Sequence, residues 1–126
     1  MLVSAALSRD GPAAQLVERW LLGEFELVVS PRLLRELARA LAYPKIRSRL
    51  GVDAGREFTS LFAQLAETVP DPGSRPSVRS RDPADDYLIA LAAAADAILV
   101  TGDAHLLDLA GAIPVETPRA FLERLS

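Results

Sequence analysis

The chain has 126 residues, half of them hydrophobic, with a formal net charge of −3 and no cysteine. This length and apolar fraction suit one domain, residues 1–126, with a single core and no room for a second domain. The lack of cysteine excludes disulfides and thiolate metal sites, and a single histidine excludes a histidine-rich metal site.

The chain opens on a short apolar segment, residues 1–7, which lacks both the basic leader of a signal peptide and the length of a membrane span. We therefore expect a cytoplasmic protein without a membrane partner. The next predicted elements are a helix over 12–22, a strand over 25–29, helices over 31–43, 45–50 and 53–67, and a brief strand at 68–69. Ser30 and Pro31 are the cap and first residue that a helix prefers, and Pro44 disfavours helical geometry in the residue before it.

The second half of the chain begins with a loop, residues 70–81, rich in proline, serine, glycine and arginine. The predicted elements after it are a helix over 82–95, a strand over 97–101, a short helix over 106–109, a strand over 113–116 and a last helix from 118. The strand over 97–101 is apolar throughout, as is typical of a central parallel strand. Because helices and strands alternate, we predict an α/β fold with three layers, α/β/α, around a mainly parallel central sheet.

Three acidic residues are expected at the carboxyl edge of this sheet, where ligands gather in open parallel sheets. Asp103 follows the apolar strand, Glu36 lies in the second turn after the first strand, and Asp86 lies near the start of the apolar helix. Carboxylates about 4 Å apart repel by roughly 4 kcal/mol at an effective dielectric constant of about 20. Mg²⁺ or Mn²⁺ would relieve this repulsion, prefers oxygen ligands, and can activate a water for phosphodiester cleavage.

Each carboxylate also has an interpretation that needs no metal. Asp103 can cap the following helix, and Glu36 lies at the border between the apolar and charged faces of its helix, where glutamates are common. Capping and the helix dipole explain Asp82 and Asp85. Asp86 begins a helix face that we expect to be buried, and a buried carboxylate needs a partner or a metal.

Basic residues gather between positions 32 and 56 of an otherwise acidic chain. This clustering predicts a local basic face. The alternative is that these arginines only solvate helix surfaces.

The order of these pieces resembles the PIN-domain family, a fold of metal-dependent ribonucleases that includes the VapC toxins of toxin–antitoxin systems. The matching segments, in the family's order, are residues 2–7, 30–37, 81–92 and 98–103. The resemblance implies an endoribonuclease, the toxin component of such a system, that uses Mg²⁺ or Mn²⁺. It would hydrolyse RNA phosphodiester bonds and leave a 5′-phosphate and a 3′-hydroxyl.

The same resemblance assigns roles to individual residues and names partners. It implies that Glu36, Asp86 and Asp103 are the catalytic, metal-binding residues, and that Ser4 and Thr101 contact a phosphate or the site. It implies an RNA contact surface formed by Arg32, Arg35, Arg39, Lys45, Arg47 and Arg49. A homodimer and an antitoxin protein are the partners that it implies.

The chain departs from the family pattern in two places. PIN domains usually begin with a hydrophobic strand ending in Asp-Thr-Asn, whose aspartate is a metal ligand, but Met1 stands where the residue after that asparagine would be. We therefore expect this chain to lack the first strand and the first acidic ligand. His105 stands where relatives often carry an acidic residue, and we interpret it as a surface residue rather than a ligand.

Two other functions match parts of the pattern. A site short of one ligand suits a catalytically impaired PIN-like module that binds RNA or a partner protein. A phosphoryl-accepting receiver-like domain also has acidic residues at a sheet edge, but the chain has no lysine in its late part. A metal-dependent endoribonuclease is the leading hypothesis.

Overall fold

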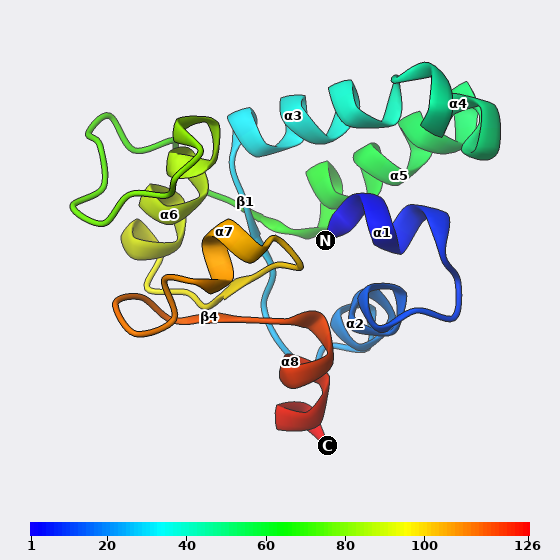
Figure 1. Cartoon of the computed structure of the whole chain (residues 1–126). Coiled ribbons are helices and arrows are strands. Elements are labelled where there is room, and N and C mark those ends of the chain that lie inside the picture. The colour runs from blue at the N-terminus through cyan, green and yellow to red at the C-terminus, as the bar shows by residue number, and fades with distance from the viewer. The chain divides into compact units, whose positions relative to one another are not determined.

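The computed structural model describes residues 1–126, which form two compact units, Met1–Val69 and Pro70–Ser126 (Figure 1). Each unit combines helices with one pair of parallel strands. The predicted α/β class and the parallel pairing are therefore confirmed. The strands are joined in two separate pairs rather than in one wide central sheet.

The first unit contains five helices and two strands. They are α1 (Leu2–Leu7), α2 (Pro12–Leu21), β1 (Val28–Val29), α3 (Pro31–Leu41), α4 (Pro44–Leu50), α5 (Val52–Leu65) and β2 (Glu67–Thr68). Strands β1 and β2 pair in parallel, with Val28 opposite Glu67, so α3, α4 and α5 form the crossover between them. Gly51, at φ 90°, separates α4 from α5, a backbone conformation that glycine adopts without strain.

Local sequence signals explain where α3 begins. The Ser30 side chain accepts a hydrogen bond from the Leu33 backbone N–H at 3.2 Å, and Pro31 occupies the first turn. The start predicted from Ser30 and Pro31 is therefore confirmed. The apolar opening segment, for which no element was predicted, forms α1, with Ala5 buried.

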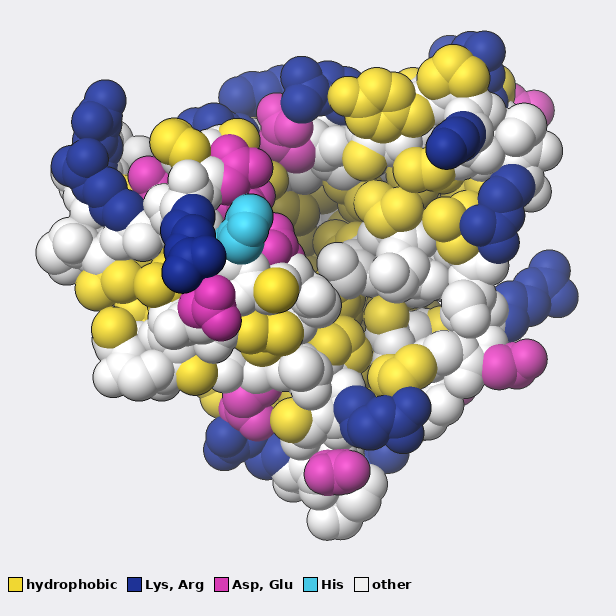
Figure 2. Space-filling view, viewed as in Figure 1, with side chains coloured by type: hydrophobic (Ala, Val, Ile, Leu, Met, Phe, Trp, Pro, Cys, Tyr) yellow, Lys and Arg dark blue, Asp and Glu magenta, His cyan; other side chains and the backbone are white.

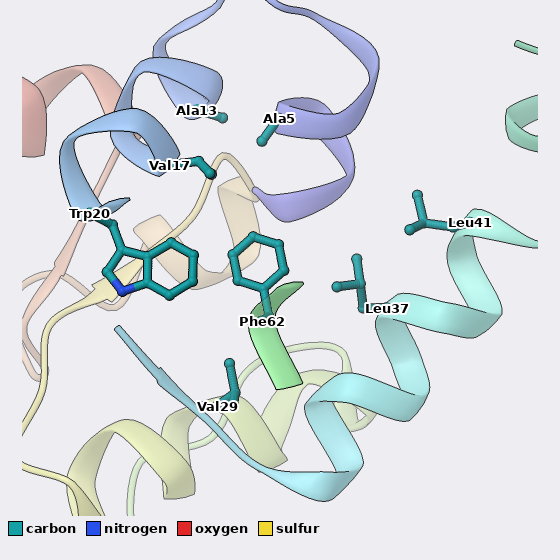
Figure 3. Packing of buried hydrophobic residues seen from close by; sticks show 8 residues of the cluster. All are labelled: Ala5, Ala13, Val17, Trp20, Val29, Leu37, Leu41 and Phe62. Atoms are coloured by element: carbon teal, nitrogen blue, oxygen red, sulfur yellow. The ribbon is translucent and has the colours of Figure 1, made fainter. Parts of the chain in front are cut away.

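An aromatic cluster lies at the centre of the first unit (Figure 3). Phe62 of α5 is fully buried, stacks on Trp20 of α2 at a centroid distance of 5.1 Å, and meets Phe58 edge-on at 4.9 Å. Val29 of β1 and Leu37 of α3 belong to the same cluster. The amphipathic spacing of α2, α3 and α5 therefore directs their apolar faces to one core.

The second unit contains a 3-10 turn, three helices and two strands. They are η1 (Pro83–Asp85), α6 (Asp86–Ala94), β3 (Leu99–Val100), α7 (Ala104–Leu107), β4 (Val115–Glu116) and α8 (Pro118–Leu125). Strands β3 and β4 pair in parallel, and the Arg124 guanidinium lies 2.5 Å from the Glu116 carboxylate, which ties α8 to β4. None of the helices of the structure combines the length and the apolar character that a membrane crossing requires.

Helix α6 differs from its prediction in two ways. Its first turn is the tighter η1, and its apolar surface is only partly covered: Ile89 and Leu91 are buried, whereas Ala93 and Ala94 are exposed. A sheet of two strands is too narrow to cover a helix on every side. Alanine tolerates the exposure because its side chain is small and favours the helix.

Candidate metal centre

Asp103 is held at the carboxyl end of β3 by two hydrogen bonds. The buried Thr101 hydroxyl accepts from the Asp103 backbone N–H at 3.0 Å, and one Asp103 carboxylate oxygen accepts from the His105 backbone N–H at 2.9 Å. The second bond caps α7. The capping interpretation of Asp103 is therefore confirmed, although it uses only one carboxylate oxygen.

The Asp85 carboxyl group interacts with the carboxyl group of Asp103, 18 positions further along the chain. Burial raises the pKa of the Asp85 carboxyl, and the negative charges of Asp103 and Asp82 raise it further. The nearby His105 acts in the opposite direction.

The capping role expected for Asp85 was wrong, because its side chain makes no cap hydrogen bond to its own helix, although Asp85 does lie in the first turn of η1, as the dipole explanation requires. The 3-10 turn before α6 directs it to Asp103 instead. A sequence signal existed in the adjacent pair Asp85 and Asp86. Neighbouring helical residues point about 100° apart, so the two side chains could not share one role.

Asp86 is anchored by the end of the preceding loop. Its carboxylate accepts a hydrogen bond from the Ser80 backbone N–H at 2.9 Å, and the buried Ser80 hydroxyl accepts from the Asp82 N–H at 3.3 Å. Asp82 in turn caps η1 by accepting from the Ala84 N–H at 3.0 Å, as predicted. The partner that a partly buried Asp86 requires is therefore the Ser80 backbone.

Glu36 lies on α3 in the first unit. Its side chain is 38% exposed and forms an ion pair with Arg39 at 3.2 Å, one turn along the helix. This agrees with its predicted place at the border between the apolar and charged faces. Asp86 and Asp103 belong to the second unit, and the convergence of all three carboxylates stays a prediction.

The remaining predicted site residues differ in exposure. Thr101 is buried and supports the backbone of Asp103, whereas Ser4 is exposed on α1. The six predicted RNA contacts are all exposed, on α3 and α4: Arg32, Arg35, Arg39, Lys45, Arg47 and Arg49. Their exposure leaves both the RNA-contact prediction and the solvation alternative open.

The chemistry of the acidic side chains suits a hard divalent cation. Oxygen ligands from carboxylates are those that Mg²⁺ and Mn²⁺ prefer. The interacting carboxyl groups of Asp85 and Asp103 concentrate negative charge at the end of β3, which a cation would neutralise. The structure groups two such carboxylates there and contains no group of three or more acidic or histidine side chains arranged around a metal position.

One comparison with known proteins identifies the family. The sequence model of the family described as PIN domain matches residues 1–105, a stretch that includes Glu36, Asp86 and Asp103. No curated protein and no solved structure matches the chain. PIN domains are commonly nucleases and generally use divalent metals. The chain belongs to the PIN-domain family.

Proposed function

We propose that this protein is a metal-dependent endoribonuclease and the toxin component of a toxin–antitoxin system. The observation that carries the proposal is the pair of interacting carboxyl groups of Asp85 and Asp103 at the carboxyl end of a parallel strand, with Asp86 next to Asp85 in the sequence. Ligand sites of α/β folds lie at such ends. The family supports the proposal, since PIN domains are commonly nucleases.

The proposed cofactor is Mg²⁺ or Mn²⁺, held by Glu36, Asp86 and Asp103. When bound, such a cation lowers the pKa of a coordinated water and stabilises negative charge on phosphate oxygens. The protein supplies the positioning. Thr101 and the α7 cap orient Asp103, and the Ser80 N–H orients Asp86, so neither carboxylate has to be ordered when the substrate binds.

The proposed reaction is hydrolysis of an RNA phosphodiester. The oxygen of water forms a bond to phosphorus as the bond from phosphorus to the 3′ oxygen breaks. The phosphate stays bonded to the 5′ oxygen of the downstream fragment, and a proton is transferred to the departing 3′ oxygen of the upstream fragment. The products are a 5′-phosphate and a 3′-hydroxyl.

The proposed partners are RNA, a second copy of the chain and an antitoxin protein, in the cytoplasm. The exposed basic side chains of α3 and α4 support RNA contact, because lysine and arginine bind phosphates without reading sequence. These side chains are Arg32, Arg35, Arg39, Lys45, Arg47 and Arg49.

A cleavage assay on labelled, structured RNA tests the proposal. We expect cleavage with Mg²⁺ or Mn²⁺ and none with EDTA. Asp103→Asn should reduce the rate by more than about 100-fold, since even outer partners of a metal cost about 10- to 100-fold. The matched control is Asp108→Asn, an exposed aspartate at the end of α7, which should cleave at the wild-type rate.

Two results would overturn the proposal. Cleavage that persists in EDTA or in Asp103→Asn would mean that the carboxylates at the end of β3 do not act in catalysis. RNA binding without cleavage in either metal would favour the catalytically impaired module that binds RNA.

A further inference from the structure

The loop before η1 carries three arginines, and we propose that it holds the RNA strand beside Asp86. We call residues 70–81, with Arg75, Arg79 and Arg81, the arginine loop. This proposal rests on the proposed function, because it assumes that RNA is the substrate. The arginine loop would be an RNA contact surface on the second unit, in addition to the RNA contact surface proposed on α3 and α4.

Charge is the first argument for the arginine loop. Residues 70–126 contain nine acidic residues and five arginines, and three of these arginines lie in the loop. The other two are Arg119, on α8, and Arg124, which pairs with Glu116. In the absence of a metal ion, an RNA phosphate that approaches the acidic end of β3 is repelled, and cationic side chains close by would offset this repulsion.

The arginine loop meets this need with exposed side chains. Arg75, Arg79 and Arg81 are all exposed, and none of them takes part in a salt bridge. Figure 1 shows the loop extending outward before α6, and Figure 2 shows basic side chains along it. The guanidinium groups are therefore available to a ligand.

Attachment to the acidic site is the second argument. Ser80 lies between Arg79 and Arg81, is buried, and donates its backbone N–H to the Asp86 carboxylate at 2.9 Å. Neighbouring Cα atoms are about 3.8 Å apart. Arg79 and Arg81 therefore each lie one residue from Ser80, whose backbone N–H contacts Asp86. We therefore expect a phosphate held by these arginines to lie near that carboxylate.

The composition of the loop indicates how it binds. It contains no aromatic residue on which a base could stack, whereas a guanidinium can bond two phosphate oxygens at once. Three prolines, at positions 70, 72 and 76, restrict the backbone, so less conformational freedom is lost on binding. The loop should therefore bind the sugar-phosphate backbone without sequence preference.

Fluorescence anisotropy with a labelled single-stranded RNA tests the proposal, on the full chain in EDTA over a series of salt concentrations. Replacing Arg75, Arg79 and Arg81 together by alanine should weaken binding. The slope of log K against log salt should become shallower by about 2, since each contact with a single strand contributes about 0.7. Melting curves check that the variant is folded.

Two controls distinguish the effect of positive charge from the effect of its position in the arginine loop. The three lysine substitutions at the same positions should keep the wild-type salt slope, because they keep the charge. Alanine at Arg9 and Arg119, both exposed and outside the loop, should leave the slope unchanged.

The outcomes distinguish the two proposals. If the wild type cleaves RNA and the alanine variant of the loop binds it with unchanged affinity and slope, the arginine loop is overturned and the proposed function stands. If the wild type neither binds nor cleaves RNA, both are overturned.

Discussion

Asp85 is the carboxyl group of the second unit whose ionised form is most clearly disfavoured. Burial, the charge of Asp103 and a hydrogen bond with that residue all raise its pKa. Its protonated form can donate to Asp103, and its ionised form repels it. The raised pKa of Asp85 therefore reflects the negative charge that its neighbours carry when no cation is present.

At this scale we predict a pH-dependent stability effect of Asp85→Asn in EDTA. A raised pKa in the folded state stabilises the fold fully below the ordinary value of 3.8, and this contribution is lost as the pH rises through the raised value. Asparagine does not ionise and can still donate to Asp103. The variant should therefore melt at a higher temperature than the wild type at neutral pH, by a margin that shrinks toward pH 3.8.

Thermal denaturation over a pH series measures this effect, with the exposed Asp10→Asn as control. The difference in melting temperature between this control and the wild type should not change comparably with pH. A margin for Asp85→Asn that stays constant with pH would contradict the assignment of the raised pKa to Asp85.

At the scale of elements, helix starts follow local chemistry that can be read from the sequence. Ser30 before Pro31 and Thr117 before Pro118 each cap a helix through a side-chain oxygen, with bonds to Leu33 N and Ala120 N. Such signals need only residues three positions apart. This is why the starts of α3 and α8 could be predicted.

The cap of η1 gives a prediction at this scale. Asp82→Ala removes the acceptor for the Ala84 N–H and should lower the free energy of unfolding by about 1 kcal/mol, without changing the cleavage rate per folded molecule. Asp82→Asn keeps an acceptor and is the matched control. We expect it to lower the free energy of unfolding by only a few tenths of the loss in Asp82→Ala. Chemical denaturation measures both, and equal losses in the two variants would contradict capping.

Strand lengths could not be predicted in the same way. Residues 97–101 were predicted as a strand, but only Leu99 and Val100 belong to β3. Strand pairing depends on a partner far away in sequence, here Val115 and Glu116, and apolar runs do not reveal where pairing stops. The same limit explains why one wide sheet was expected where the chain forms two strand pairs.

At the scale of the whole molecule, the first unit depends on one aromatic cluster. Phe62 is fully buried between Trp20 and Phe58. Phe62→Ala should lower the free energy of unfolding by about 3 to 5 kcal/mol, a large share of the 5 to 15 kcal/mol typical of a folded domain. Leu65→Ala, on the same helix and 59% exposed, should change it by less than about 0.5 kcal/mol.

Denaturant titration of both variants checks this prediction. Similar losses for Phe62→Ala and Leu65→Ala would show that the cluster does not determine the stability of the first unit.

The acidic residues show how far the site itself could be predicted. The carboxyl end of a strand singled out Asp103 as a candidate ligand, and its helix face singled out Asp86, both from local pattern. Asp85 was missed because its partner is set by the tight turn of η1. Glu36 was selected by resemblance, since a glutamate at a helix border carries no signal of its own.

The central claim is that Glu36, Asp86 and Asp103 hold one metal ion. Titration with Mn²⁺, followed by electron paramagnetic resonance, tests it without requiring cleavage. The variants are Glu36→Gln, Asp86→Asn and Asp103→Asn, each checked for folding, with Glu57→Gln of α5 as an exposed control. We predict one site in the wild type and the control, weakened by at least about 10-fold in each of the three variants. Wild-type affinity in Glu36→Gln would contradict the claim.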